Sequence, residues 1–262
     1  MWTYQHTHFK VHQIPALNDN YIYIIEDCQS DIVCIVDPAQ AHIVQQACQT
    51  LGLTPTHILN THHHWDHTDG NAELVQTYHC QVIGNQEDAK RIPCLSHPIS
   101  ANGSFTLGRL HIQHMDMPGH TLGHIAYKID DALFCGDTLF GGGCGRLFEG
   151  TPQQMWQSLQ TLANLSDTTQ IYCAHEYTLP NLRFARAVDP HNKALKQRIT
   201  RDTQTRIKKQ PTIPSSIGLE KQTNPFLRPL NPAFIQAYNQ ENNTCFDALQ
   251  VFTHLRERKN NW

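Results

Sequence analysis

The sequence has 262 residues, of which 39% are hydrophobic and 16% are charged. This length and composition fit one large domain, or a larger domain with a smaller one attached, and exclude a disordered chain. The net charge is −3 with histidine neutral, which gives no reason to expect nucleic acid or an anionic membrane as a partner. No apolar run approaches the roughly 18 residues that a membrane-spanning helix needs. The first residues show neither the basic nor the apolar region of a secretory signal.

The nine cysteines are an odd number and are scattered without close pairing. Cys34, Cys135 and Cys173 lie inside apolar runs, where reduced thiols behave as small hydrophobic groups. A chain of this length needs no disulfide framework to fold. We therefore expect free thiols and a cytoplasmic location.

The first third of the chain is expected to form short strands separated by turns. Residues 21–25 and 32–36 are apolar, β-branched runs that predict a buried hairpin. Apolar residues at helical spacing predict a helix over 43–51, which Gly52 ends. Residues 56–59 predict another strand, with a histidine-rich segment at its carboxyl end.

The middle of the chain continues as an alternation of strands and helices. Thr151, Pro152 and Gln154 form a capping box with proline at the first helical position, which predicts a helix to about residue 165. Further elements are predicted at 71–78 (helix), 81–84 (strand), 105–117 (hairpin turning at 108–109), 125–129 with 132–135 (hairpin) and 171–174 (strand).

After residue 174 the strand patterns end and helices are expected. The sequence predicts helices over 182–188 and 194–209, a proline-rich connector over 210–216, and a last helix that includes residues 249–255. Six basic residues lie between 196 and 209. We interpret them as a solvated helix face, with nucleic-acid contact as the lesser alternative.

Four candidate metal-binding residues lie within six positions: His62, His64, Asp66 and His67. His62 and His64 alternate on an extended stretch, so both imidazoles can point to the same side. Asp66 and His67 follow as the chain turns. Such a set suits a pair of metal ions better than one tetrahedral structural site, which usually includes cysteine. A histidine-rich loop that binds no metal is the alternative, and the order His-x-His-x-Asp-His at a strand end argues against it.

This order resembles the signature of the metallo-β-lactamase superfamily, whose members share a four-layer αβ/βα sandwich. Motifs at 118–124, 135–140, 143–146, 174–178 and 224–228 narrow the resemblance to the glyoxalase II family, the hydroxyacylglutathione hydrolases. The resemblance extends over nearly the whole chain, and the run 175–178 and the helical tail are its most specific parts. It implies an α/β fold, with a metallo-β-lactamase-like catalytic domain at 1–174 and an α-helical substrate-binding domain at 175–262.

The resemblance also implies two divalent metal ions, each held by three side chains and both joined by a bridging aspartate. The first metal takes His62, His64 and His120, the second takes Asp66, His67 and His175, and the bridge is Asp137. Zinc is the expected metal, with iron or manganese as alternatives, because sites of histidine and carboxylate accept all three. The resemblance makes neither His63 nor His124 a ligand, so we expect both to support the site.

The implied activity is hydrolysis of S-D-lactoylglutathione to D-lactate and glutathione, the second step of methylglyoxal detoxification. The expected nucleophile is a hydroxide that bridges the metals, since two metal ions about 3.5–4 Å apart lower the pKa of a shared water toward neutrality. Asp66 and Asp137 are the expected catalytic residues, and Asp66 also orients the proton of the nucleophile. Cys144 is expected to pack rather than react, because nothing adjacent is suited to ionise it.

Glutathione contacts carried over from the resemblance are Arg146, Tyr177 and Arg228. Arginine suits this task because it binds a carboxylate with two parallel hydrogen bonds. The sequence departs from some relatives in two respects: Phe148 replaces a tyrosine, and no lysine closely follows Arg228. Arg256 or Lys259 could compensate, although we interpret both as solvated surface residues. The expected partner is this small thioester, bound by a monomer, with no nucleic acid or membrane.

Two other classes of function remain open at this stage. The first is a different enzyme on the same scaffold, either a persulfide dioxygenase with one iron or a phosphodiesterase acting on RNA. The second is a metal-stabilised binding module without catalysis, since a fold does not determine a function. The complete second set of ligands argues against the one-iron dioxygenase. Counting the metals per chain would distinguish that enzyme from a two-metal hydrolase.

Overall fold

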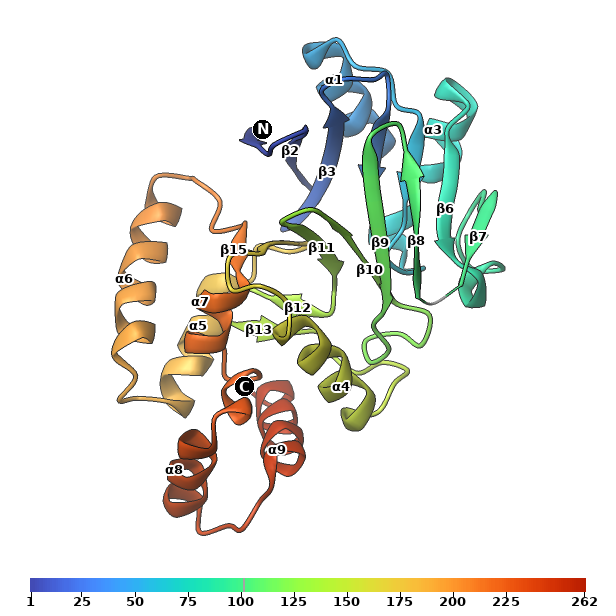
Figure 1. The fold of residues 1–262 in the computed structure, drawn as a ribbon. Helices are drawn as coiled ribbons and strands as arrows, with labels where there is room; N and C mark the ends of the chain where they lie inside the picture. The colour runs from blue at the N-terminus through green and yellow to red at the C-terminus, as the bar shows by residue number, and fades with distance from the viewer. Residues whose placement is uncertain (101) are drawn as a thin grey trace. The chain divides into compact units, whose positions relative to one another are not determined.

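The computed structural model describes residues 1–100 and 102–262, which group into two compact units. Unit 1 comprises Met1–Asp116 and Gly123–Gly136, and unit 2 comprises Met117–Leu122 and Asp137–Trp262. Figure 1 shows both units, with most of the strands in the N-terminal half of the chain and mainly helices in the C-terminal part.

A seven-stranded sheet forms the centre of unit 1, with its strands in sequence order. The first four strands are antiparallel neighbours and the last four are parallel neighbours. Their bounds are β1 (Trp2–Gln5), β2 (Phe9–Ala16), β3 (Asn20–Asp27), β4 (Val33–Val36), β5 (His57–Leu59), β6 (Gln81–Asn85) and β7 (His97–Ile99). Because the carboxyl ends of parallel strands meet at one edge, residues that follow β4 and β5 lie close together.

Helices connect the parallel strands of unit 1, as the right-handed crossover between parallel strands requires. They are α1 (Ala41–Leu51), α2 (Trp65–Thr68), α3 (Asn71–Tyr78) and the short 3₁₀ helix η1 (Gln86–Asp88). Gly52 ends α1 in the left-handed region with φ 69°, as the sequence predicts. Val44 on α1 and Leu74 on α3 pack with Ile35 and Ile58 of the sheet in one hydrophobic core (Figure 1).

A second group of strands in unit 1 packs against the seven-stranded sheet. It is the antiparallel series β8 (Gly103–Leu107), β9 (Leu110–Asp116), β10 (Ile125–Ile129) and β11 (Ala132–Gly136). The Tyr127 hydroxyl donates to the Asn60 carbonyl at 3.0 Å, and the rings of Tyr23 and Phe134 meet edge to face. The two groups of strands therefore share a buried face.

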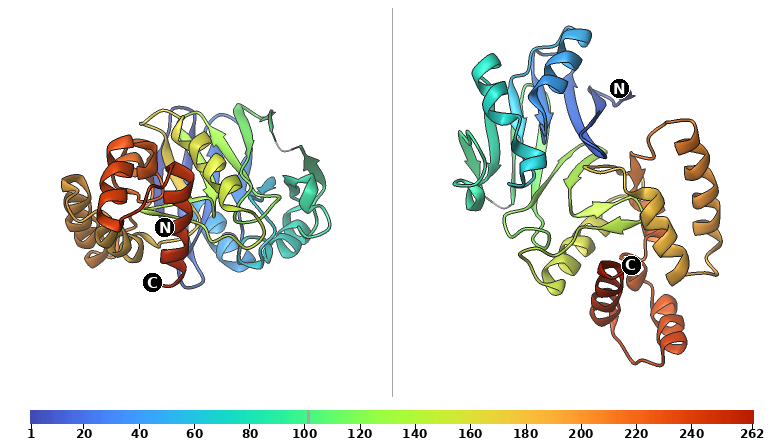
Figure 2. Two further views of the ribbon diagram at one scale, coloured as in Figure 1. Left: turned by 90° about the horizontal axis from the view of Figure 1, so that it is seen from below. Right: turned by 180° about the vertical axis from the view of Figure 1, so that it is seen from behind.

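Unit 2 is mainly helical. Its helices are α4 (Pro152–Ala163), α5 (Thr178–Val188), α6 (Lys193–Ile207), α7 (Ile217–Thr223), the 3₁₀ helix η2 (Arg228–Leu230), α8 (Pro232–Asn242) and α9 (Ala248–Asn260). Its strands are the pairs β12 (Leu139–Phe140) with β13 (Gly143–Cys144), and β14 (Gln170–Cys173) with β15 (Ser215–Ser216). Helices α5 and α6 lie side by side in both views of Figure 2, and α4 packs on α9.

Aromatic side chains form the centre of the helical part of unit 2. Phe226 lies between Phe184 and Phe252, and Trp156 of α4 contacts Phe252 of α9. Phe184, Phe226 and Phe252 are fully buried. These contacts tie helices far apart in the sequence to one apolar core, which is the main source of stability for helices of this length.

Most predicted elements are present. The strands β1, β2, β7, β12 and β13 and the short helix α2 were not predicted, and further differences lie after residue 174. The predicted proline-rich connector is wrong in part, because it contains the short strand β15 and leads directly into α7. Helix α8 was not predicted. The solvated face expected between residues 196 and 209 is wrong for Arg198, which is 2% exposed and forms ion pairs with Asp202 and Glu220. Among the helices of residues 1–100 and 102–262, none is long and apolar enough to cross a membrane.

Candidate active site

The histidine segment of unit 1 begins at the carboxyl end of β5 and runs into α2. His62 is fully buried, and its Nε2 lies 3.0 Å from Nδ1 of His64. The ring of His67 lies 4.1 Å from that of His62, measured between centroids. The alternation of His62 and His64 therefore places both rings on one side, as predicted.

Asp37 orients this segment from the end of the neighbouring strand β4. Its carboxylate accepts the Thr61 backbone N–H at 2.8 Å and the Thr61 hydroxyl at 2.7 Å, and it lies 3.0 Å from Nδ1 of His67. A carboxylate on Nδ1 fixes the imidazole so that Nε2 is the nitrogen available to a ligand. Asp37 was not among the residues predicted for the site, although its place at the end of a strand was a usable signal.

Asp66, His63 and His124 occupy distinct surroundings in unit 1. The Asn20 side chain donates to both the backbone carbonyl and the carboxylate of Asp66, at 3.1 and 3.2 Å. His63 contacts Asp88 through Nδ1 at 3.1 Å. His124 is buried and stacks on His62, with the ring centroids 4.7 Å apart. His63 and His124 thus contact the segment or its supports, which agrees with the supporting role expected for them.

In unit 2, Asp137 lies between two histidines. Its Oδ2 is 3.3 Å from Nε2 of His120, and its Oδ1 is 3.3 Å from Nε2 of His175. The Nδ1 atom of His120 lies 2.8 Å from the backbone carbonyl of Arg146, which leaves Nε2 directed toward Asp137. All three side chains are nearly buried.

The residues of both groups fit a divalent metal. They offer imidazole nitrogens and carboxylate oxygens, the donors that zinc, iron and manganese accept. Their histidines are oriented through the other ring nitrogen, by Asp37 for His67 and by a backbone carbonyl for His120, as in protein metal sites. Side chains from both groups belong to sets of histidine and aspartate that could hold a metal ion. The protein therefore has the donors of a divalent metal site.

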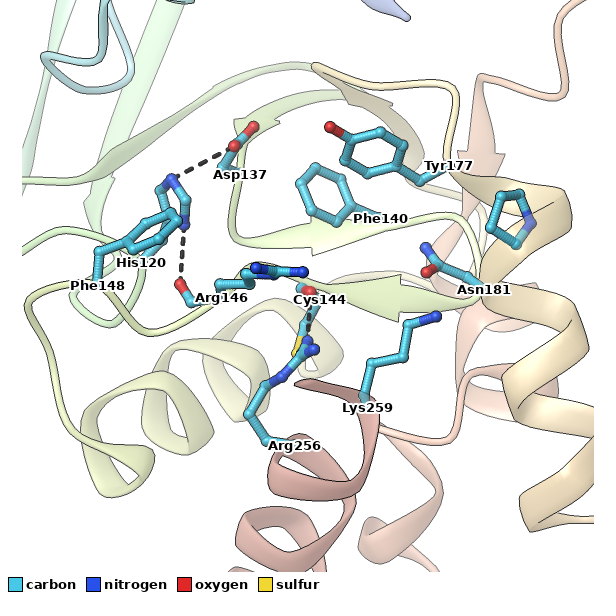
Figure 3. A pocket seen from close by; sticks show the side chains of 11 residues that line it. His120, Asp137, Phe140, Cys144, Arg146, Phe148, Tyr177, Asn181, Arg256 and Lys259 are labelled. Carbon is cyan, nitrogen blue, oxygen red and sulfur yellow. Dashed lines mark hydrogen bonds and ion pairs between the residues drawn. The ribbon is translucent and has the colours of Figure 1, made fainter. Parts of the chain in front are cut away.

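A pocket of about 390 Å³ in unit 2 adjoins His120 and Asp137. Figure 3 shows these two side chains at one end, with Phe148 beside His120, and Arg256 and Lys259 at the other end. The ring of Phe148 meets that of His120 at 5.2 Å, and the ring of Phe140 meets that of Tyr177 at 5.3 Å. The full lining is His120, Asp137, Phe140, Cys144, Arg146, Phe148, Tyr177, Pro180, Asn181, Arg256 and Lys259.

The end of the pocket remote from Asp137 is positively charged. Burial lowers the pKa of Lys259 below its ordinary value of 10.5, and the nearby cations Arg256, Arg183 and Arg146 lower it further. Arg256 is 4% exposed and donates from Nη1 to the carbonyl of Cys144 at 2.9 Å. Such a cluster favours an anionic ligand, whose charge would offset the mutual repulsion of the cations.

The structure changes the interpretation of three basic residues of the C-terminal part. Arg256 and Lys259 were expected to be solvated surface residues, and this is wrong, because both line the pocket and Arg256 is buried. Their spacing of three residues on one helix, which places them on the same face, was the available signal. Arg228 is in different surroundings: its Nε donates to Asp189 at 3.0 Å and its guanidinium lies over the Phe234 ring.

Cys144 lies in the wall of the pocket. It is buried, and burial raises the pKa of its thiol above the ordinary value of 9.0, although Arg256 partly opposes this. The thiol therefore stays protonated at neutral pH, which agrees with the packing role expected from the sequence.

Comparison with known proteins identifies the family of the chain. A family model described as the C-terminus of hydroxyacylglutathione hydrolase matches residues 176–262, and the metallo-beta-lactamase superfamily model matches residues 20–93 and 100–175. A hydroxyacylglutathione hydrolase of Rhodospirillum rubrum is 44% identical over 255 residues, which are 96% of this chain and 98% of that protein. One of Acaryochloris marina is 45% identical, with 95% of this chain and 98% of that protein covered.

The chain belongs to the hydroxyacylglutathione hydrolase family. Solved structures support the fold. ETHE1 from Myxococcus xanthus aligns with a TM-score of 0.65 at 24% identity, over 95% of this chain and 97% of that one. A metallo-beta-lactamase from Staphylococcus aureus aligns with a TM-score of 0.65 at 20% identity, over 97% and 72%. The predicted α/β metallo-β-lactamase fold with a helical C-terminal region is thereby confirmed.

Proposed function

We propose that this protein hydrolyses the thioester S-D-lactoylglutathione to D-lactate and glutathione, the second step of methylglyoxal detoxification. Membership of the hydroxyacylglutathione hydrolase family over nearly the whole chain supports the reaction class. The observation on which the substrate rests most directly is the pocket, which combines Asp137 and His120 at one end with a cluster of cations at the other. Glutathione contains two carboxylates, which suit that cluster.

The proposed cofactor is a pair of divalent metal ions, zinc in the first instance and iron or manganese as alternatives. We propose that His62, His64 and His120 hold one ion, that Asp66, His67 and His175 hold the other, and that Asp137 bridges them. The assignment follows the family motifs, and the orientation of His67 by Asp37 and of His120 by a backbone carbonyl supports it. The ions, when bound, would supply a nucleophile at neutral pH and polarise the thioester carbonyl.

The residues of the chain have separate tasks in the proposed reaction. Asn20 donates one hydrogen bond to the Asp66 carboxylate and one to the Asp66 backbone carbonyl, and the carboxylate so held would accept a hydrogen bond from the attacking water and orient it. Asp137 has one carboxylate oxygen 3.3 Å from Nε2 of His120 and the other 3.3 Å from Nε2 of His175, so it would share one ion with each histidine. The leaving group is a thiolate whose conjugate acid has a pKa of about 8.5, so no side chain needs to protonate it as it departs.

Substrate recognition is proposed at the cationic end of the pocket. Arg146 and Tyr177 are the sequence-based candidates that line it, and Arg256 and Lys259 join them on structural grounds. Lys259 and Arg256 would supply the charge of the lysine that is missing after Arg228, and hydrogen-bond donors in place of the hydroxyl that Phe148 lacks. Arg228 stays a candidate from the sequence, and its ion pair with Asp189 is an alternative role that the experiment below separates.

The division into a catalytic domain at 1–174 and a substrate-binding domain at 175–262 is also a proposal. The pocket supports it in part, because Tyr177, Arg256 and Lys259 come from the second range. We further propose that the protein acts as a monomer in the cytoplasm, on a small thioester and without nucleic acid or membrane. The free cysteines support a reducing compartment.

The reaction and the metals are tested together. Purified protein should cleave S-D-lactoylglutathione, and elemental analysis should find two divalent metals per chain. In Asp137→Ala both the metal content and turnover should fall steeply. His63→Ala is the control and should keep both metals, since His63 contacts Asp88 and Arg91. Two tightly bound metals and near-normal hydrolysis in Asp137→Ala would refute the assignment, and one metal in the unaltered protein would favour a mononuclear enzyme.

Recognition is tested by comparing Arg256→Ala with Arg228→Ala. An arginine–carboxylate contact in a partly exposed pocket stabilises by about 1.5–3 kcal/mol, so its loss lowers kcat/KM roughly ten- to a hundredfold. The contact binds substrate and transition state alike, so KM should rise while kcat changes little. We expect this effect in Arg256→Ala on lactoylglutathione but not on a small thioester without glutathione. The same selective loss in Arg228→Ala would establish its substrate role, and equal losses on both substrates would assign it to the fold.

A further inference from the structure

The hairpin formed by β12 and β13 is one wall of the pocket in unit 2. Phe140 and Cys144 both line the pocket, and the ring of Phe140 meets that of Tyr177 edge to face. The Cys144 carbonyl accepts a hydrogen bond from Nη1 of Arg256 at 2.9 Å. The place of this hairpin therefore determines where an aromatic ring and a guanidinium face the ligand (Figure 3).

This hairpin has little intrinsic stability. Its strands pair only Leu139 with Cys144 and Phe140 with Gly143. Gly141 and Gly142 connect them, a third glycine, Gly143, begins β13, and Gly142 has φ 65° in the left-handed region. Glycine loses more conformational freedom on folding than any other residue, and an isolated two-stranded hairpin is marginal in water. Its ordered position must come from contacts outside it.

Those contacts come largely from α7 and the residue that follows it. Oε2 of Glu220 accepts the Gly142 backbone N–H at 2.8 Å. The same oxygen accepts the Asn224 side chain at 3.0 Å. The Asn224 amide also donates to the carbonyls of Gly143 and Phe140, at 2.9 and 3.2 Å. Glu220 and Asn224 are fully buried.

A buried arginine on α6 balances the charge of Glu220. Arg198 donates from Nη2 to Oε1 of Glu220 at 2.6 Å, and from Nε to Asp202 at 3.2 Å. Burial alone would lower the pKa of Arg198, but Glu220 and Asp202 raise it above its ordinary value. Burying a carboxylate without such a partner is strongly unfavourable, so the contact with Arg198 offsets the cost of burying Glu220 beside the hairpin.

We propose that Glu220, paired with Arg198, is a positioning residue for substrate recognition. It fixes the glycine turn of the hairpin, and through the hairpin it sets the positions of Phe140, Cys144 and Arg256 in the pocket. The identity of the substrate rests on the proposed function, whereas the contact between Glu220 and the hairpin does not. An ion pair that served only to join α6 to α7 would affect stability without affecting the pocket.

The variant Glu220→Gln separates these two roles. A carboxylate accepts on both oxygens, but an amide accepts on one side and donates on the other. Arg198 and the Ser215 hydroxyl donate to one side of Glu220, while Gly142 and Asn224 donate to the other. The hydrogen bond from the charged guanidinium is the stronger, so the amide oxygen should remain toward Arg198. The NH₂ group would then face the Gly142 N–H, and the turn would lose its anchor.

Asp202→Asn is the matched control. It removes one carboxylate from the same guanidinium, but Asp202 contacts Arg198 and Arg201 rather than the hairpin. Both variants should lower the midpoint of thermal unfolding. Only Glu220→Gln should raise KM for S-D-lactoylglutathione, by about tenfold, while kcat stays within about twofold. This is the effect expected when the hydrogen bond that positions the hairpin is lost.

Hydrogen exchange measured by mass spectrometry gives a readout independent of activity. Backbone amides of residues 139–146 should exchange faster in Glu220→Gln and at the unaltered rate in Asp202→Asn. If the unaltered protein does not cleave lactoylglutathione, the proposed function fails while this measurement still decides the positioning role. Unchanged exchange at 139–146 in Glu220→Gln overturns the proposal, as does an equal increase in both variants.

Glu220→Asp covers the case in which Glu220→Gln does not fold. It keeps two acceptor oxygens and the charge but is one methylene shorter, so it should retain the pair with Arg198 and weaken the contact with Gly142. In Glu220→Asp we expect both the exchange rate at 139–146 and KM to lie between the values of the unaltered protein and those of Glu220→Gln. If Glu220→Gln does not fold, both quantities in Glu220→Asp should still exceed those of the unaltered protein. Unaltered exchange and KM in Glu220→Asp would also overturn the proposal.

Discussion

Asp37 follows β4 with φ 49°, a conformation in which aspartate is tolerated better than most residues. This backbone places its carboxylate where it accepts two hydrogen bonds from Thr61 and meets Nδ1 of His67. The residue thus fixes both the start of the histidine segment and the direction of one proposed metal ligand. The strand end before Asp37 marks the residue as a candidate, but its partner cannot be identified locally, because Thr61 lies 24 residues further along the chain.

We expect Asp37→Asn to weaken metal binding. Asparagine has one acceptor oxygen in place of two, so the hold on Thr61 and on the His67 ring would be reduced. Loss of a partner that orients a ligand typically lowers metal affinity about ten- to a hundredfold. Competition with a chromophoric chelator measures the affinity.

Asp131→Asn is the control for that measurement. It disrupts a similar aspartate–histidine pair, in which Asp131 lies 2.7 Å from Nδ1 of His6, away from the histidine segment. Metal affinity should be unchanged there. Equal affinities in Asp37→Asn and the unaltered protein would show that His67 needs no support from Asp37.

Lys259 should make substrate binding depend on pH in the alkaline range. Its pKa is lowered first by burial and then by Arg256, Arg183 and Arg146, and it holds a carboxylate only when protonated. KM for lactoylglutathione should therefore rise with pH below the ordinary lysine value of 10.5. Steady-state kinetics over that range, corrected for spontaneous hydrolysis, measure the rise.

Two further results check the role of Lys259. Lys259→Arg keeps its charge throughout, so its KM should stay flat, and a rise of the same size would assign the effect to another group. The unfolded chain also holds this proton more tightly than the folded one. The contribution of Lys259 to the free energy of unfolding should therefore increase as the pH rises from the lowered pKa of the folded protein toward 10.5.

For single helices and strands, the local sequence predicted those boundaries that local contacts determine. The capping box at Thr151 and the glycine after α1 give those helices their observed ends. Helix α8 has an equally local start, with Asn231 as its cap and Pro232 at its first position, but its weak apolar pattern concealed it. Strand β15 has two residues and is held by β14, so no local pattern marks it. Helix α7 has a serine cap, Ser216, but seven residues were too few for an apolar pattern to show it.

Helix α4 offers a test of one such local signal. The Thr151 hydroxyl accepts the Gln154 N–H at 3.2 Å, and the Gln154 side chain accepts the Thr151 N–H at 2.9 Å. Thr151→Ala should lower the free energy of unfolding by about 1 kcal/mol, as measured by urea titration. Thr161→Ala on the same helix is the control and should cost less, because its hydroxyl donates only to the Gln157 carbonyl within the helix. Equal losses would mean that the capping box adds nothing.

For the whole molecule, the alternation of strands and helices and the family motifs were sufficient to predict the α/β fold and the helical C-terminal part. The sequence did not reveal the charged lining of the pocket. Arg256 and Lys259 lie more than 100 residues from Cys144 and Arg146, and only folding brings them to one pocket. Arg198 resembled a surface residue because its partners, Asp202 apart, are distant in the sequence.

Metal removal should lower the stability of the whole protein. A ligand that binds only the folded state stabilises it in proportion to the logarithm of its concentration over the dissociation constant. Chelation should therefore lower the midpoint of thermal unfolding, and added zinc should restore it. Asp137→Ala should respond to the chelator much less. An unaltered midpoint after complete metal removal would contradict tight binding by the folded protein.

The buried thiol in the pocket wall has a chemical consequence for an enzyme proposed to release glutathione. Thiol–disulfide exchange requires a thiolate, and the raised pKa of Cys144 keeps that group protonated and sheltered. Oxidised glutathione should accordingly form mixed disulfides with the exposed Cys28, Cys94 and Cys245 before it reacts with Cys144. The recognition pocket can then remain unmodified under oxidative conditions in which the surface thiols react.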